Sequence, residues 1–185
     1  RVDQLYEFWC FFKLAEELAR ALGEDRPHFE GFSTDERGGL RYGLKAKLPE
    51  GYELVYNRIF APGKGSYSVP LRPDFSLFHD GKLRVVFDAK FRFDEIDIAD
   101  LDEPIEGEIE EAVQKGDVER VAKHADLCKM HAYRDALRCH AALILYPGTE
   151  LKFYKTNSRG KSCVDVLSVV KCGYEGVGAV PMVPG

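Results

Sequence analysis

A β-hairpin in the middle of the chain constrains the fold most strongly. Two apolar segments, Asp74–Phe78 and Leu83–Phe91, flank Asp80-Gly81, and Asp-Gly between such segments is a strong signal for a hairpin turn. Asp88 and Lys90 stand two residues apart near the end of the second segment, which puts them on one face of a strand. A carboxylate and an ammonium on an apolar strand are costly unless something uses both charges. The hairpin therefore predicts a sheet with a functional site at its open end.

The segments around the hairpin predict an α/β domain. Asp3–Leu22 and Asp117–His140 repeat apolar residues near the helical period, which indicates two long helices. Ala141–Tyr146 is wholly apolar, as expected for a strand in a sheet covered on both faces. Glycine and proline signals delimit further predicted strands at Phe29–Ser33, Leu40–Lys47, Glu53–Phe60, Leu151–Lys155 and Val164–Val170, the last with a helix as the alternative. We therefore expect a mixed β-sheet flanked by helices, with a Gly- and Pro-rich tail from Gly173.

The buried side of the second predicted helix follows from its apolar residues. They recur at intervals of three to four positions, which is the spacing of one helix face. The residues expected to face the core are Val121, Ala125, Cys128, Ala132, Ala136 and Leu137.

The carboxylates of the hairpin suit a divalent metal ion. Mg²⁺ prefers hard oxygen ligands, usually one or two carboxylates with water and substrate phosphate, and the hairpin brings Asp74 towards Asp88. A bound cation lowers the pKa of its water ligand and stabilises charge on a phosphate. Lys90 can hold that water and offset the same charge. Together these residues predict a site that hydrolyses phosphodiesters.

The turn sets a condition on this site. If Asp80-Gly81 forms a two-residue turn, Asp74 lies opposite Phe87, and Asp74 and Asp88 then face opposite sides of the sheet. A shared metal ion requires a three-residue loop, a β-bulge or a sharp bend near Pro73. We predict that one of these is present.

Pro73-Asp74 followed by Asp88-Ala89-Lys90 resembles the signature of the PD-(D/E)XK nuclease superfamily. The order of helix, hairpin, long helix and apolar strand is similar as well. The resemblance implies a restriction-endonuclease-like core and Mg²⁺-dependent hydrolysis of DNA, with Mn²⁺ able to substitute. It also implies that Asp74, Asp88 and the carbonyl of Ala89 bind the metal ion and that Lys90 orients the attacking water. The alternative for Asp88 and Lys90 is a simple salt bridge at a strand end.

Both predicted helices carry residues that fit the same resemblance. Family members often place a metal-binding Glu on the first helix, where this chain has Glu7; the alternative is a solvated helix residue. Lys129 and Tyr133 share a face of the second helix and resemble the QxxxY motif of RecB-type members, with Lys in place of Gln. They would support the site or bind the scissile phosphate. For Lys129 the alternative is an exposed helix charge.

The combination is most similar to the restriction-associated branch related to the McrC nuclease subunit. This implies a DNA-cutting effector of a restriction or phage-defence system that works with a motor NTPase or another subunit of that system. A homodimer would supply two sites for cutting both strands. Two alternatives stay open: a catalytically inactive nuclease-fold module for DNA binding or assembly, and a structure-specific DNA repair nuclease.

The formal net charge of −5 is unusual for a protein that binds phosphates. Ten acidic residues and no Lys or Arg lie between Asp94 and Glu111, and the rest of the chain has more basic than acidic residues. A mildly basic body fits a nuclease to which a partner delivers DNA. We expect residues 94–116 to be a mobile insertion. One hypothesis is that this acidic segment mimics DNA and guards a basic cleft.

The length of 185 residues suits a single nuclease domain, and the start at Arg1 suggests a domain excised from a longer protein. Five cysteines without a CxxC pair indicate reduced thiols and a cytoplasmic protein. No apolar run approaches the roughly 20 residues of a membrane span, so no membrane association is expected.

Overall fold

The apolar strands at the centre of the chain form the middle of one large mixed sheet. The computed structural model describes residues 1–31, 43–91, 118–156 and 165–185, without the side chains of 118–124. In chain order the elements are α1 (Val2–Ala21), β1 (His28–Glu30), β2 (Lys45–Lys47), the 3-10 turn η1 (Pro49–Gly51), β3 (Tyr52–Tyr56), β4 (Ala61–Pro62), β5 (Gly65–Ser66), β6 (Phe75–His79), β7 (Lys82–Ala89), α3 (Val118–Leu137), β8 (Ala141–Tyr146), β9 (Lys152–Lys155), α4 (Val166–Cys172) and β10 (Gly176–Pro181).

The sheet has eight strands in the order β1-β2-β3-β6-β7-β8-β10-β9, and β4 pairs separately with β5. The pairs β1–β2, β2–β3, β3–β6 and β6–β7 are antiparallel. β8 then lies parallel to both β7 and β10, and β9 closes the edge antiparallel to β10. The sheet is therefore mixed, as predicted. α3 lies between β7 and β8 in the chain, which allows the parallel crossover.

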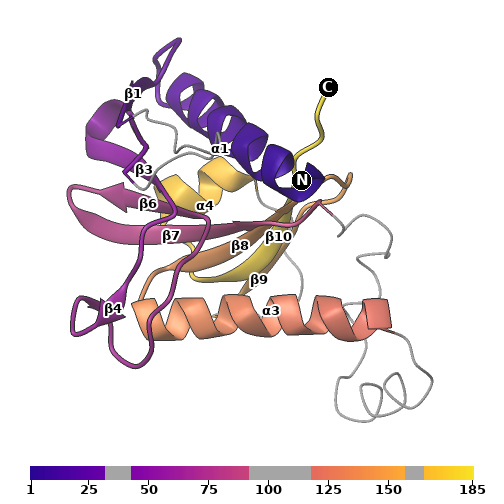
Figure 1. Ribbon diagram of the computed structural model, residues 1–185. Helices are drawn as coiled ribbons and strands as arrows, with labels where there is room; N and C mark the ends of the chain where they lie inside the picture. The colour runs from indigo at the N-terminus through magenta and orange to yellow at the C-terminus, as the bar shows by residue number, and fades with distance from the viewer. Residues whose placement is uncertain (32–42, 92–117, 157–164) are drawn as a thin grey trace.

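Helices cover both faces of this sheet. α1 and α4 lie on one face and α3 lies on the other (Figure 1). Side chains of β8 alternate between the two sides, since Leu143 packs in the core cluster with α1 while Ile144 packs in the cluster with α3. Every residue of β8 is buried. This explains why the segment is apolar at each position rather than at every second one.

A β-bulge in the β6–β7 hairpin satisfies the condition set by the turn. Asp80 and Gly81 both have positive φ, which is the geometry of a two-residue turn. The pairing of His79 with Lys82 near the turn changes to Phe75 with Phe87 near the open end. The shift lies between Leu77 and Phe78 and leaves Arg84 as the extra residue of β7. Continuing the shifted register puts Asp74 opposite Asp88, so the predicted irregularity is confirmed as a bulge.

Two predictions for the C-terminal part of the chain are wrong in part. Where a strand was predicted at Val164–Val170, helix α4, the alternative, begins at Val166. Asp165 caps this helix by accepting a hydrogen bond from the Ser168 amide at 2.6 Å. The Gly- and Pro-rich tail contains β10, which lies between β8 and β9 inside the sheet. A Cβ atom at Gly176 or Gly178 would collide with backbone carbonyls of β9. Glycine here marks close packing of strands rather than an irregular tail.

The predicted buried side of α3 is also wrong in part. Three of the residues expected to face the core are exposed: Ala125, Cys128 and Ala132. Met130 and Tyr133 are buried instead, on a side of the helix that includes the correctly predicted Ala136 and Leu137. Large side chains bury more apolar area than Ala or Cys, so they decide which side of the helix faces the sheet.

Some predictions fall on residues that the structure does not describe. The acidic segment 94–116, Cys163 and the side chain of Val121 lie outside the described residues. Within the described ranges, Cys10, Cys139 and Cys172 form no disulfide, as expected. No helix in these same ranges combines the length and the apolar character needed to span a membrane.

Candidate active site

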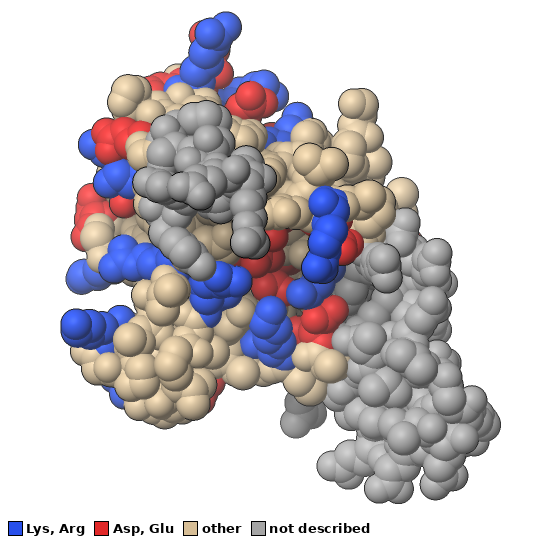
Figure 2. Space-filling view, in the orientation of Figure 1, with Lys and Arg blue, Asp and Glu red and all other residues tan. Residues whose placement is uncertain are grey.

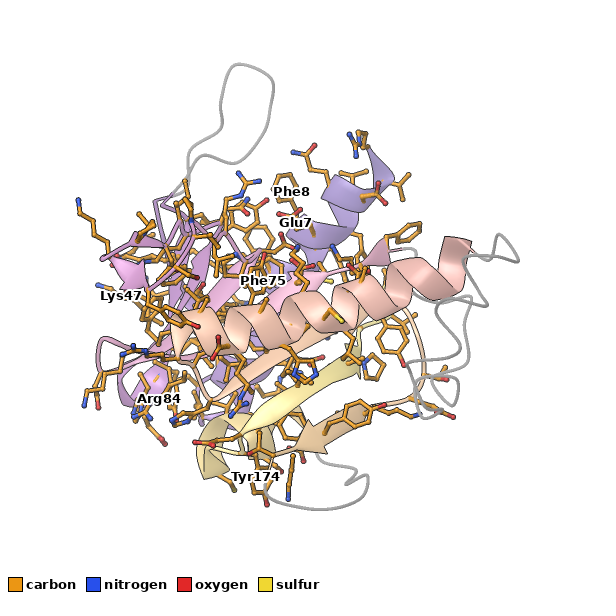
Figure 3. All side chains as sticks on the ribbon, turned by 90° about the horizontal axis from the view of Figure 1, so that it is seen from below. Glu7, Phe8, Lys47, Phe75, Arg84 and Tyr174 are labelled. Atoms are coloured by element: carbon orange, nitrogen blue, oxygen red, sulfur yellow. The ribbon has the colours of Figure 1, made fainter. Side chains whose placement is uncertain are left out.

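The candidate site lies at the open end of the β6–β7 hairpin. Asp74 immediately precedes β6, Asp88 and Ala89 end β7, and Lys90 follows directly. α1 brings Glu7 from one face of the sheet. Figure 3 labels Glu7 near Phe75, the first residue of β6. α3 brings Lys129 and Tyr133 from the other face, so the elements predicted to carry the site meet in space.

Asp88 is the most deeply buried charged residue of the site. Its side chain is 1% exposed, and Lys90 Nζ lies 2.7 Å from its Oδ2. Lys129 Nζ contacts the same carboxylate at 3.1 Å from Oδ1 and 3.3 Å from Oδ2. Two ammonium groups therefore balance one carboxylate, as the burial of a charge requires. The predicted placement of Asp88 and Lys90 on one face of the strand is confirmed.

Asp74 shares this end of the sheet with two other carboxylates. The backbone N–H of Ala89 donates a hydrogen bond to Asp74 Oδ2 at 2.7 Å, which ties Asp74 to the residue after Asp88. Burial, together with the charges of Asp88 and Glu7, raises the pKa of Asp74 to about 8 despite the opposing effects of the Ala89 amide and Lys90. Burial and neighbouring negative charges both favour the neutral carboxyl.

Glu7 points into the fold rather than into solvent. Tyr56 donates a hydrogen bond to Glu7 Oε1 at 2.6 Å, and Asn57 Nδ2 lies 3.5 Å from the same atom. Burial and the Glu7 carboxylate raise the pKa of the Tyr56 hydroxyl, so Tyr56 remains a donor. The solvated alternative for Glu7 does not agree with these contacts. The Glu7 charge acts on the Asp74 carboxylate, so Glu7 lies on the Asp74 side of the site.

Lys129 and Tyr133 contribute to the site in different ways. Lys129 Nζ reaches Asp88 and lies 5.2 Å from the centre of the Tyr133 ring. Tyr133 is 3% exposed, and its hydroxyl donates a hydrogen bond to the carbonyl oxygen of Arg72 at 3.2 Å. Burial, with smaller effects of Asp88 and Asp74, raises the pKa of this hydroxyl. Tyr133 thus holds the chain two residues before Asp74, whereas Lys129 contacts an acidic residue of the site directly.

Asp126 is a member of the site that the sequence prediction missed. Its Oδ1 lies 3.7 Å from Lys90 Nζ, and its side chain is 26% exposed. Burial alone would lower the pKa of Lys90, but Asp88 and then Asp126 outweigh it and the pKa is raised. Asp126 lies three residues before Lys129, a spacing that places both on one side of a helix. That spacing was available in the sequence as a signal.

The side chains of the site include the oxygen donors that a divalent cation prefers. Asp74 and Asp88 supply hard oxygens. Burial, and then the charges of Asp88 and Glu7, raise the pKa of Asp74, and a bound cation would offset both effects. Among the described residues, no three Asp, Glu, His or Cys side chains converge closely enough to hold a metal ion by themselves. Two carboxylates with a carbonyl and water ligands are sufficient for Mg²⁺. The residues present therefore fit an open, water-rich metal site and not a closed protein cage.

Charged side chains gather on the face of the molecule drawn in Figure 2. Asp and Glu side chains lie in the middle of this face, and Lys and Arg side chains border them. A phosphate backbone is attracted by such a border, while the acidic centre needs a cation before phosphate can approach it. On this face, basic side chains therefore border an acidic centre.

The comparison with protein families agrees with this arrangement. The family model described as the PD-(D/E)XK nuclease superfamily matches residues 4–151, a range that includes every predicted site residue. No curated protein and no solved structure matches the chain. The mixed sheet flanked by helices is a restriction-endonuclease-like core. The match covers most of the chain and agrees with the fold, so the chain belongs to the PD-(D/E)XK nuclease superfamily.

Proposed function

We propose that this chain is a Mg²⁺-dependent DNA endonuclease domain. The observation that carries the proposal is the meeting of Asp74 and Asp88 at one end of the hairpin, with Lys90 held on Asp88. The superfamily match supports a nuclease in general. The choices of Mg²⁺, of DNA and of internal cleavage belong to the proposal.

Asp74, Asp88 and the carbonyl of Ala89 would hold the cation. The N–H and C=O groups of one strand residue point to the same side of the strand. Because the Ala89 N–H is directed at Asp74, its carbonyl lies on that side too. When bound, Mg²⁺ supplies an acidified water ligand and positive charge for the scissile phosphate. Mn²⁺ offers the same preference for oxygen ligands and is expected to substitute.

Glu7 would complete the metal site from α1. Both recorded hydrogen bonds to its carboxylate go to Oε1. In the described part of the chain no hydrogen bond to Oε2 is recorded, which leaves this atom for the cation or for one of its waters. Tyr56 and Asn57 then fix the direction of the carboxylate.

Lys90 would act as a charged donor and not as a general base. Its ammonium stays protonated because Asp88 and Asp126 raise its pKa against the effect of burial. A protonated Lys90 donates a hydrogen bond to the attacking water and offsets negative charge on the phosphate. Lys129 is proposed to bind the scissile phosphate, since a cation bound to Asp88 would replace one of its contacts with that carboxylate. Tyr133 is proposed to position the Arg72–Asp74 segment.

We extend the proposal to the biological setting. An effector of a restriction or phage-defence system, similar to the branch related to the McrC nuclease subunit, fits a chain with an acidic segment and a basic remainder. Such an effector receives DNA from a motor NTPase or another subunit of its system. Cutting both strands would require two copies of this site, which a homodimer supplies.

A plasmid-cleavage assay tests the function. Supercoiled DNA is incubated with wild type, Asp88→Asn and Lys90→Ala in Mg²⁺, in Mn²⁺ and in EDTA, with Asp25→Asn and Lys171→Ala as exposed, charge-matched controls. We expect metal-dependent nicking or linearisation by wild type and both controls, and a loss of at least about 100-fold in the two site variants. Equal cleavage by all five proteins would refute the mechanism.

The second candidate function is an inactive module that binds DNA or assembles a complex. The observation that favours it is that both oxygens of Asp88 are engaged by lysines, so that a cation has to compete with them. Duplex DNA bound by wild type without cleavage in either metal, alone or with its partner subunit, would support this candidate.

A further inference from the structure

An arch of residues 57–73 connects β3 to β6 and begins and ends at the candidate site. At its start, the Asn57 amide donates to the carbonyl oxygen of Asp74 at 2.7 Å, and the Asn57 side chain lies near Glu7. At its end, the Arg72 carbonyl accepts the hydrogen bond from Tyr133. Any substrate at the carboxylates therefore lies next to the base of this arch.

The arch has a defined conformation of its own. Phe60 and Leu71 exchange two backbone hydrogen bonds at 2.8 and 2.9 Å, and the Phe60 side chain is buried beneath them. The end of α3 supports the arch from the side, where the Tyr67 amide donates to the Ala136 carbonyl and the Tyr67 hydroxyl donates to Asp135. Figure 1 shows β4, within the arch, beside this end of α3. A surface that is already ordered loses little entropy when it binds a partner.

The charge of the arch has one sign. It contains Arg58, Lys64 and Arg72 and no Asp or Glu, in a chain whose net charge is −5. Arg58 and Lys64 are exposed, and within the described residues neither forms a recorded salt bridge. Arg58 instead lies over the ring of Phe78, 4.7 Å from its centre, which fixes its direction. By contrast, Lys45 on the neighbouring β2 pairs with Glu30 and Glu53.

The outer surface of the arch is also apolar. Ile59, Tyr67 and Val69 are each more than half exposed. Exposed apolar side chains on the same loop as the exposed Arg58 and Lys64 are unusual for a surface that meets only water. A nucleic acid matches both properties, because its phosphates pair with the cations and its sugars and base edges contact the apolar groups.

We infer that the arch is a DNA-binding arm that enters a groove of duplex DNA beside the scissile phosphate. Arg58 and Lys64 contact phosphates on the two sides of the groove, and Ile59 and Val69 contact the groove floor. This inference rests on the proposed nuclease function, since it assigns the contact that positions the duplex for the Asp74 and Asp88 carboxylates.

Binding is measured without divalent metal, so that cleavage does not enter. Fluorescence anisotropy of a labelled 24-base-pair duplex in EDTA is recorded over a range of salt concentrations for wild type and two double variants. Arg58→Ala/Lys64→Ala removes the charges, and Ile59→Ser/Val69→Ser removes the apolar contacts. Arg20→Ala/Lys171→Ala, on α1 and α4 at the opposite face of the sheet, is the control matched in residue type. Circular dichroism melts verify that each variant is folded.

The expected results separate the two kinds of contact. The charge variant binds roughly tenfold more weakly, and the slope of log K against log salt falls by about 2, one for each lost phosphate contact. The apolar variant binds several-fold more weakly with an unchanged slope, and the control resembles wild type. Wild type binds the duplex more tightly than a single strand of the same length.

Three results would overturn the inference. One is equal binding by the charge variant and the control, which would assign the arch to a protein partner instead. Another is equal affinity for duplex and single strand, and the third is the absence of duplex binding by wild type. If plasmid cleavage by wild type persists alongside any of these, the nuclease function stands and only the arm is rejected. Loss of plasmid cleavage in Asp88→Asn or Lys90→Ala tests the catalytic residues and leaves the inference about the arm unaffected.

Discussion

Replacing Asp74 with Asn is expected to stabilise the metal-free protein at alkaline pH. Asp74 is buried beside Asp88 and Glu7, and its pKa is raised to about 8, against about 3.9 in an unfolded chain. The folded state therefore favours the neutral carboxyl. Its contribution to stability is fully present below about pH 4 and is lost as the pH rises through 8. The substitution keeps the shape of the side chain and removes the charge.

The size of this effect follows from the shift. One pKa unit corresponds to about 1.4 kcal/mol, so the upper limit is about 6 kcal/mol. Because waters and side chains rearrange around a buried charge, we expect about 2–4 kcal/mol. For a domain of this size, 1 kcal/mol corresponds to roughly 2–4 °C in Tm.

The assay is unfolding by heat and by urea in EDTA at pH 5 and pH 9, with exposed Asp25→Asn as the control. The difference in stability between Asp74→Asn and wild type should grow in favour of the variant between pH 5 and pH 9, while the control difference stays constant. Added Mg²⁺ should stabilise wild type at pH 9 and leave Asp74→Asn unchanged. A difference that does not change with pH would refute the account of crowded carboxylates.

Three further substitutions test other contacts of the site. Asp88→Asn leaves Lys90 and Lys129 without their buried partner, so calorimetry should record a decrease of about 1–3 kcal/mol in the free energy of unfolding. The decrease is limited because both lysines are partly exposed, and unchanged stability would contradict the charge balance. Asp126→Asn should lower kcat for plasmid cleavage with little change in KM for DNA, because it frees Lys90 to move. Asp126→Glu should restore most of the rate, and equal kcat in the Asn and Glu variants would show that Asp126 does not position Lys90. Tyr133→Phe removes the hydrogen bond to Arg72 and should cost about 1 kcal/mol while cleavage persists; abolished cleavage at unchanged stability would instead place its hydroxyl in the chemistry.

The sequence was sufficient to predict the hairpin, the two long helices and the apolar strand β8, because each has a strong local signal. It was also sufficient to require an irregularity between Asp74 and Asp88. It was not sufficient to place the bulge at Arg84, since the Arg84 carbonyl accepts a hydrogen bond from His140, a residue far away in the chain. That contact depends on how β7 meets the start of β8.

The strand β10 escaped prediction for a related reason. Gly176 and Gly178 are needed where β10 approaches the backbone of β9, and only the assembled sheet reveals that closeness. Asp126 is a different case, because its spacing from Lys129 was readable in the sequence. A charged helix residue is usually solvated, and the contact with Lys90 became evident only when α3 was seen against the end of β7.

The central claim is that Asp74 and Asp88 share one divalent cation. Titration of metal-free protein with Mn²⁺, followed by the electron paramagnetic resonance of the free ion, measures this directly. The account predicts one site in wild type that is lost in both Asp74→Asn and Asp88→Asn and retained in Asp25→Asn. Binding of Mn²⁺ by Asp74→Asn with the affinity of wild type would contradict it.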